Sequence, residues 1–158
     1  MALAPVNHAM QNASRMTADQ EISRQWVDAV NAHDPAQIQA LLHPDFVWEL
    51  GGSSTTSAAA SAEAWRLWFV GFPDFQFEVL RSVGETDIIV QQLRMRGTHS
   101  GEFRFRGTHS LEKPIAPTRK TFDLPGCAIH QIVAGKIARL WAYWDTSTLL
   151  RQLDIQQA

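Results

Sequence analysis

The sequence predicts an α+β fold, in which helices come first along the chain and long strands follow. Two observations support this prediction. Apolar residues recur three or four positions apart up to Gly71, whereas from residue 75 onward they alternate with polar residues. Helices followed by a run of alternating strands are typical of helices packed on an antiparallel sheet.

A first helix is predicted over residues 18–32. Thr17 and Gln20 have the spacing of a capping box, in which each side chain binds the backbone N–H of the other residue. Trp26 and Val30 then recur at helical spacing and give the helix one apolar face.

A second helix is predicted to begin at Pro35, because Asp34 is a good N-cap and proline is well tolerated in the first turn. This helix should end before His43 and Pro44. Residues 46–50 (FVWEL) then have the composition of a short strand.

The segment 51–61, GGSSTTSAAAS, contains only small residues and is predicted to be a loop. Ser61 is expected to cap a third helix that carries three aromatic residues and continues to about residue 70. Gly71 and Pro73 should end this helix.

The alternation of apolar and polar residues predicts strands near 75–83, 86–99, 102–106, 120–133 and 136–144. The last two should form a hairpin through Ala134 and Gly135, because this pair suits a tight turn. Asp145 is expected to be the N-cap of a final helix.

The chain has 158 residues, of which 45% are hydrophobic, and this is enough for one ordinary core. We expect a flexible N-terminal segment, residues 1–16, and a single domain, residues 17–158. The single cysteine excludes an intramolecular disulfide.

A net charge of −2 gives no electrostatic basis for binding nucleic acid or an anionic membrane, so neither is an expected partner. No apolar run reaches the roughly 20 residues that a membrane-spanning helix needs. The first residues do not have the pattern of a secretory signal, and a cytoplasmic protein is therefore expected.

Four short motifs occur in a characteristic order: residues 72–78 (FPDFQFE), 96–101 (RGTHSG), 135–137 (GKI) and 144–153 (WDTSTLLRQL). Over about residues 17–155 the chain thereby resembles the SnoaL-like polyketide cyclase family, which shares a cone-shaped fold with nuclear transport factor two and ketosteroid isomerase. The resemblance implies a cystatin-like cone, with helices packed on a strongly curved antiparallel or mixed sheet that encloses one apolar cavity. It also implies a homodimer formed through the open sheet face.

The same resemblance places the acid and base of the cyclases on residues that cannot transfer a proton. The acidic position falls on Ala142, and the position of the assisting histidine falls on Ala128. Leu140 stands where many relatives carry a histidine. The usual catalytic side chains are therefore missing from these positions.

Two histidines remain as candidate catalytic residues, His99 and His130. Strand alternation puts His99 on the same face as Met95, and His130 on the same face as Leu124 and Ala128. We infer that this is the cavity face, where an imidazole could move a proton near neutral pH. A histidine on an apolar face is also frequently a core residue, and both interpretations stay open.

An aromatic wall is predicted from Trp48 and Trp144, which have the parity to face a flat apolar ligand in the cavity. Glu49 has the opposite parity and is expected to be a surface carboxylate. The predicted substrate-binding residues are Trp26, Trp48, Met95, Leu124, Ala128, Leu140, Ala142 and Trp144.

The sequence RGTHS occurs twice, at residues 96–100 and 106–110. A continuous strand would separate His99 and His109 by roughly 33 Å, so the two are not expected to form one site. The second copy is expected in a loop. No zinc-binding, phosphate-binding or dinucleotide motif is found, and neither a metal nor a cofactor is predicted.

Three functions fit these observations. The first is a SnoaL-like enzyme that performs cyclisation, isomerisation or another proton transfer on a hydrophobic carbonyl compound. The second is a noncatalytic binding protein for an apolar ligand, which Ala128 and Ala142 favour. The third is a dimeric assembly module that buries its sheet face, including Trp141. Segments 51–61 and 107–118 stay open as possible lids over the cavity.

Overall fold

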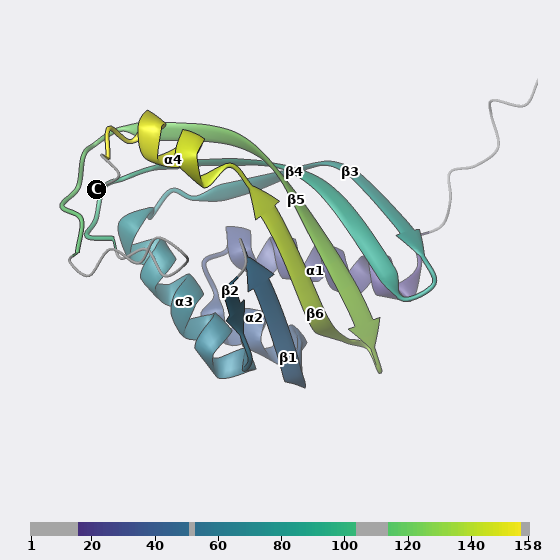
Figure 1. Cartoon of the computed structure of the whole chain (residues 1–158). Coiled ribbons are helices and arrows are strands. Elements are labelled where there is room, and N and C mark those ends of the chain that lie inside the picture. The colour runs from purple at the N-terminus through teal and green to yellow at the C-terminus, as the bar shows by residue number, and fades with distance from the viewer. Residues whose placement is uncertain (1–15, 51–52, 104–113, 156–158) are drawn as a thin grey trace, which may run out of the picture.

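The computed structural model describes residues 16–50, 53–103 and 114–155. In these residues four helices pack on a curled sheet of six strands that does not close into a barrel (Figure 1). The predicted α+β cone is therefore confirmed. The elements are α1 (Ala18–Asn31), α2 (Pro35–Leu41), β1 (Leu42–Leu50), β2 (Ser53–Thr55), α3 (Ala58–Gly71), β3 (Gln76–Glu85), β4 (Ile88–Thr98), β5 (Thr121–Val133), β6 (Lys136–Trp144) and α4 (Thr146–Gln152).

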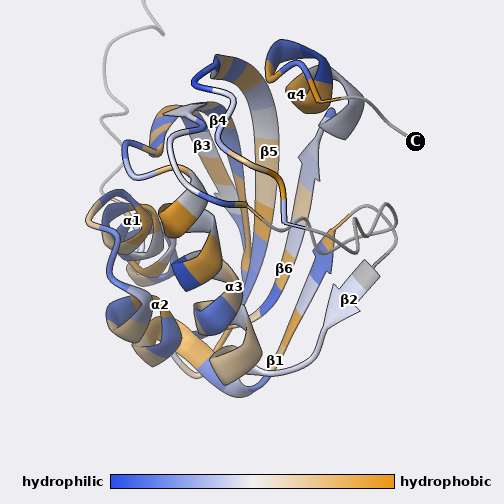
Figure 2. Ribbon diagram, turned by 90° about the vertical axis from the view of Figure 1, so that its left-hand side faces the viewer, coloured by the Kyte–Doolittle hydropathy of each residue, from blue (hydrophilic) through white to orange (hydrophobic). Residues whose placement is uncertain are grey.

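The sheet is mixed, with the strand order β2-β1-β6-β5-β4-β3. Strand β1 runs parallel to β6, and every other neighbouring pair is antiparallel. Helices α1, α2 and α3 lie on the same side of the sheet (Figure 2). Alternate strand residues face these helices, so the core lies between the helices and the concave side of the sheet.

The predicted starts of α1 and α2 and the predicted hairpin are confirmed. The backbone N–H of Gln20 donates to the Thr17 hydroxyl at 3.1 Å, and the Thr17 N–H donates to the Gln20 side chain at 2.9 Å. Asp34 caps α2. Ala134 and Gly135 both have positive φ, at 49° and 71°, as the turn between β5 and β6 requires.

The prediction of a loop over residues 51–61 is wrong in part. Ser57, not Ser61, is the N-cap of α3, because its hydroxyl accepts the N–H of Ala60 at 3.0 Å. Ser61 is buried within the helix. The alanines at 58–60 are strong helix formers, and their small size had suggested a loop only because they offer little to pack. Residues 53–55 form the edge strand β2.

Strand β1 begins at Leu42, four residues earlier than predicted. Its pairing with β6 is irregular between Leu42 and Val47. Pro44 lies in this irregular part. Proline has no backbone N–H, and here its absence interrupts no regular ladder of hydrogen bonds between the strands. The chain thus passes directly from α2 into the sheet.

Some predictions fall on residues that the structure does not describe. Of the predicted strand 102–106, Phe103 forms an isolated bridge with Ile115, and residues 104–106 lie outside the described part. The second RGTHS with His109 lies outside it too, as do residues 1–15 of the predicted N-terminal segment.

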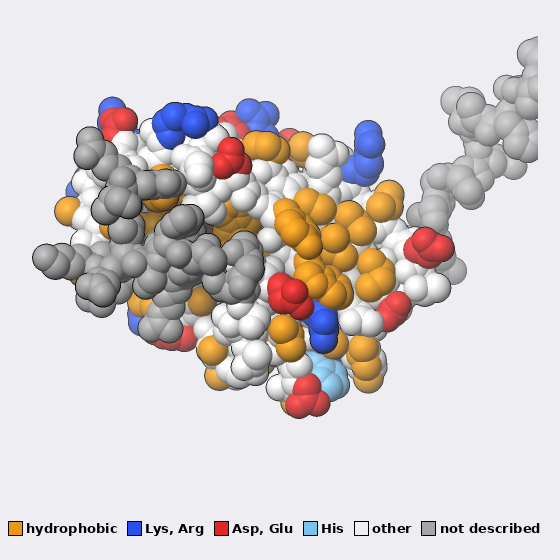
Figure 3. Space-filling model, in the orientation of Figure 1, with side chains coloured by type: hydrophobic (Ala, Val, Ile, Leu, Met, Phe, Trp, Pro, Cys, Tyr) orange, Lys and Arg blue, Asp and Glu red, His pale blue; other side chains and the backbone are white. Residues whose placement is uncertain are grey.

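The outer face of the sheet carries an apolar patch over β5 and β6 (Figure 3). The strand pairing places Val83, Val90, Ile129 and Trp141 side by side in a row across four strands. Tyr143 is the most exposed of the large apolar side chains nearby, at 57%. We name these five residues the outer apolar row.

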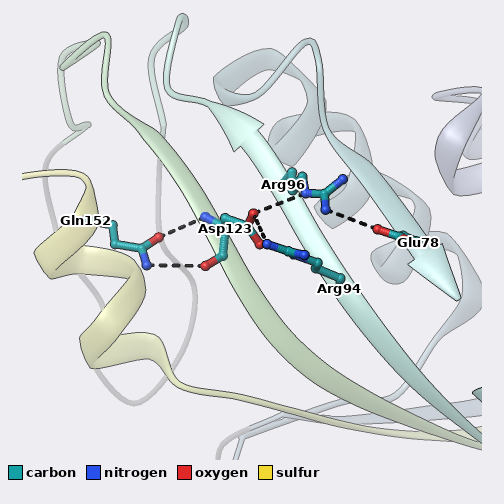
Figure 4. Close-up of polar contacts among 5 residues, drawn as sticks. All are labelled: Glu78, Arg94, Arg96, Asp123 and Gln152. Atoms are coloured by element: carbon teal, nitrogen blue, oxygen red, sulfur yellow. Dashed lines mark hydrogen bonds and ion pairs between the residues drawn. The ribbon is translucent and has the colours of Figure 1, made fainter. Parts of the chain in front are cut away.

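Helix α4 is attached where β5 extends beyond the end of β6. Their pairing ends at Gly126 and Trp144, so the backbone of Asp123 has no strand on that side. The side chain of Gln152 takes this place, accepting the Asp123 N–H at 2.8 Å and donating to its carbonyl at 3.2 Å (Figure 4). The carboxylate of Asp123 binds Arg94 and Arg96 on β4.

Candidate functional site

A pocket of about 140 Å³ lies between α3 and the strands of the sheet. Four indole rings line it: Trp48 from β1, Trp65 and Trp68 from α3, and Trp144 from β6. Phe75, Phe77, Met95 and Phe103 complete much of the wall. We call this space the tryptophan pocket.

A smaller hollow, which we call the inner hollow, continues from the pocket. The lining residues that the two share are Trp48, Trp65, Phe77, Met95 and Trp144. Trp26 of α1 and Ala128 of β5 add further wall to the inner hollow. Leu140 and Ala142 of β6 also line it.

The aromatic rings of the pocket are packed against one another. Trp48 and Trp65 are nearly parallel, with an interplanar angle of 4° and a centroid distance of 5.8 Å. Trp26 meets Trp65 edge to face at 5.7 Å. On the other side, Trp68 packs edge to face on Phe103 at 5.2 Å. Such mutual contacts make the wall largely aromatic and suited to a flat ligand.

The chemistry of the pocket wall is strongly apolar. None of its described lining residues is an acid, a lysine, an arginine or a histidine. Polar side-chain groups are the Thr55 hydroxyl and the four indole N–H groups. Cys127 lines the inner hollow, and burial raises the pKa of its thiol, which keeps it protonated near neutral pH.

The indole nitrogens of Trp48, Trp65, Trp68 and Trp144 are all buried and have no hydrogen-bond partner among the described residues. A buried donor normally has a partner, so four unsatisfied donors around one space are unusual. Each of them can only donate a hydrogen bond, so only an acceptor would satisfy it.

The predicted substrate-binding residues divide into three groups in the structure. Trp48, Met95 and Trp144 line both the pocket and the inner hollow. Only the inner hollow is lined by Trp26, Ala128, Leu140 and Ala142. Leu124 is buried but lines neither space.

Sequence reasoning missed the contribution of α3 to the pocket. Ala60, Ala64, Leu67 and Trp68 line it, and their spacing of three and four residues identifies one face of a helix. This signal was hidden because the helix was predicted to begin at Ser61, which left Ala60 in a loop. Because the side chains of Ala60 and Ala64 are small, they leave space for the pocket that the indole rings surround.

His99 is fully buried just beyond the end of β4 and lines neither the pocket nor the inner hollow. Its Nδ1 accepts the backbone N–H of Thr118 at 3.2 Å. Its ring packs near Phe72, at a centroid distance of 5.4 Å. Burial lowers the pKa of His99, while backbone groups of Gly101 and Ile115 act in the opposite direction.

His130 is also fully buried and lines neither space. Its Nδ1 forms a hydrogen bond with the Ser23 hydroxyl of α1, and its Nε2 has no partner within the described ranges. The ring meets Trp26 edge to face at 5.0 Å. Burial lowers the pKa of His130 to about 3, so the imidazole is neutral at physiological pH.

The structure does not bring the two histidines together. His130 pairs with Ile89, ten residues before His99 along the neighbouring strand. At the rise of a strand this separation is roughly 33 Å. The two imidazoles could therefore not act together on one ligand, and their catalytic role stays a prediction.

Two carboxylates lie where the sequence indicated. Glu49 is partly exposed on the outer side, where Arg139 lies 3.6 Å away. Asp145 caps α4 by accepting the N–H of Thr148 at 3.0 Å. Within the described ranges, no three metal-ligating side chains are grouped.

The curled mixed sheet with helices on its concave side is the fold of solved structures described as ketosteroid isomerase-like and as NTF2-like. The chain belongs to the SnoaL-like polyketide cyclase family, whose model matches residues 20–153. None of the curated proteins matches the chain significantly. In the described part of the chain, no helix is both long enough and apolar enough to cross a membrane.

Several solved structures share the fold. A SnoaL-like protein from Jannaschia sp. CCS1 superposes with a TM-score of 0.77 at 18% identity, covering 92% of this chain and 99% of its own. AclR from Streptomyces galilaeus has a TM-score of 0.73 at 24% identity, with 89% and 98% coverage. IdmH from Streptomyces antibioticus has a TM-score of 0.68 at 22% identity, with 87% and 99% coverage. At these identities the similarity establishes the fold alone.

Proposed function

We propose that this protein binds a flat, apolar small molecule in the tryptophan pocket and the inner hollow. The observation that carries the proposal is the pocket wall, where four indoles surround about 140 Å³ and no described lining side chain is titratable. Pockets of this composition are the usual sites of hydrophobic ligands. Burying the ligand faces against indole rings supplies the binding free energy.

A binding role is favoured over the usual cyclase chemistry by two alanines. The family resemblance assigns the acid and base positions to Ala142 and Ala128, and both side chains line the inner hollow. A ligand there meets methyl groups that cannot donate or accept a proton. The hollow therefore offers shape and apolar surface at the position where the cyclases place their catalytic pair.

A second candidate is a SnoaL-like enzyme that transfers a proton on a hydrophobic carbonyl compound, in a cyclisation or an isomerisation. His130 favours it, because its Nε2 has no partner and its ring contacts Trp26, a wall residue of the inner hollow. Rotation of Trp26 would open a path from the ligand to this imidazole.

Calorimetric titration with a panel of polycyclic ketones tests the binding proposal. Ala64→Phe places a ring in the pocket and should weaken binding at least tenfold. Ala59→Phe adds the same ring on an exposed position of α3 outside the pocket, and this control should keep the wild-type affinity. Equal affinities for all three proteins would refute the pocket as the binding site.

Liquid chromatography coupled to mass spectrometry of the ligand after long incubation separates the two candidates, because an isomerised product has the mass of the ligand but a different retention time. Recovery of an unchanged ligand supports the binding protein. A product that disappears in the His99→Ala/His130→Ala double variant supports the enzyme, provided that circular dichroism shows the variant to be folded. A product formed equally by the double variant would remove both histidines from the mechanism.

A further inference from the structure

We propose that the ligand of the tryptophan pocket carries hydrogen-bond acceptors, such as carbonyl oxygens, and that the unpartnered indole N–H groups bind them. The inference rests on the proposed binding function and goes beyond it, because it assigns the polar recognition chemistry of the site. It concerns which apolar molecules the pocket selects.

The first observation is the state of the indole nitrogens. Those of Trp48, Trp65, Trp68 and Trp144 are buried and have no hydrogen-bond partner in the part of the chain that the structure describes, and all four side chains line the same pocket. Trp65 is the most completely buried, with 5% of its surface exposed. An indole N–H can only donate, so only an acceptor satisfies it.

The second observation is the scarcity of acceptors among the side chains of the wall. The described lining side chains include no carboxylate, amide or imidazole. The Thr55 hydroxyl and the weakly accepting thioether of Met95 are what remains. A ligand that presents N–H or O–H groups would therefore bury them with few side-chain acceptors nearby, which weakens its binding.

The third observation is the placement of the donors on two walls. Trp48 and Trp144 come from the sheet, whereas Trp65 and Trp68 come from α3. A flat molecule between the walls meets donors from both sides. Because each nitrogen is covered by neighbouring atoms, the ligand oxygen reaches it when a ring shifts, and the hydrogen bond forms in the complex.

Three tricyclic probes of nearly equal shape test the inference: fluorene has neither donor nor acceptor, 9-fluorenone has one carbonyl acceptor, and carbazole has one N–H donor. We expect fluorenone to bind about fivefold tighter than fluorene, a typical gain for one net hydrogen bond. Carbazole should bind no better than fluorene. Affinities are measured by equilibrium dialysis and corrected for the partition of each probe into an apolar solvent.

Equal corrected affinities for fluorene and fluorenone would overturn the inference and leave the binding function standing. Preference for carbazole would overturn it too. If no probe binds, both the inference and the proposed binding function are contradicted. A failure of the inference alone, in which the probes bind without a preference for fluorenone, therefore gives a different result from a failure of the proposed function.

Indole ¹H–¹⁵N spectra of the wild-type protein give a readout that needs no pocket variant. Fluorenone should move at least one pocket indole N–H signal downfield, as a new hydrogen bond does, whereas fluorene should not. Trp141 on the outer face is the internal control, assigned with Trp141→Phe, and its signal should stay in place. Trp144→Phe keeps an aromatic ring without the donor and should reduce the preference for fluorenone. Absence of any downfield shift with bound fluorenone would overturn the inference.

Discussion

The Ser23 hydroxyl of α1 and the Nδ1 atom of His130 on β5 form a hydrogen bond that joins the first helix to the sheet inside the core. The two residues are 107 positions apart in the sequence. Both are fully buried, and Trp26 covers the imidazole. This contact gives His130 a structural role whatever its part in any reaction.

Stability should depend on pH through His130. Its pKa is about 3 in the folded protein and about 6.5 in the unfolded chain, so between these values the unfolded chain binds a proton that the folded protein excludes. The free energy of unfolding should therefore fall as the pH decreases below 6.5, by up to about 1.4 kcal/mol per pH unit from this group. Burial lowers the pKa of His99 too, which acts in the same direction.

Urea unfolding at pH 7.5, 6.5 and 5.5 measures this dependence. His130→Asn, which cannot titrate, should have a shallower pH dependence than the wild type. Parallel curves for the two proteins would show that His130 takes up its proton in the folded state.

Removing the hydroxyl of Ser23 should destabilise the protein. Ser23→Ala leaves Nδ1 of His130 buried without its partner, and such a loss costs about 1–3 kcal/mol. Ser82→Ala, at an exposed position of β3, is the matched control and should change stability little. An unfolding free energy equal to that of the wild type would show that the core rearranges to satisfy His130.

Gln152 should stabilise the attachment of α4. Gln152→Ala removes both hydrogen bonds to the Asp123 backbone, and we expect a loss of about 1 kcal/mol in the free energy of unfolding. Amide hydrogen exchange should become faster at Asp123, whose N–H would lose its acceptor. Gln92→Ala, at an exposed position of β4, should leave both quantities unchanged.

The outer apolar row should form the interface of a homodimer. Val83, Val90, Ile129 and Trp141 lie side by side on the outer face, and Tyr143 is exposed beside them. We therefore propose a dimer through this sheet face, because monomers rarely expose continuous apolar surface. Light scattering at micromolar concentration should give the mass of two chains.

Tyr143→Glu should convert this dimer to a monomer, since an interface that buries the outer apolar row would also bury the new charge. Gln39→Glu adds a carboxylate at an exposed position of α2, away from the row, and should leave the mass unchanged. A wild-type protein with the mass of one chain would contradict the proposed interface.

Local signals in the sequence determined much of the fold. The capping box at Thr17, the caps at Asp34 and Asp145, and the turn at Ala134 and Gly135 each depend on residues a few positions apart, and all are confirmed. Alternation placed each strand residue on one face of the sheet, because neighbouring side chains point to opposite faces. The four motifs indicated the family that the matching model establishes.

Only the tertiary structure decided which of the inward residues surround a cavity. His99, Leu124 and His130 are buried on the inner side, yet they pack into the core away from the pocket. Alternation gives the direction of a side chain, but not whether a helix covers it.

The pocket itself is assembled from β1, β2, α3, β3, β4 and β6, which extend over residues 42–144 of the sequence. Its four indole donors come together because β1 pairs in parallel with β6 and because α3 lies across them. No local pattern encodes the space that remains between such elements, since it depends on how all of their side chains pack at once. The sequence by itself therefore determined the elements and their faces, and the tertiary packing determined the site.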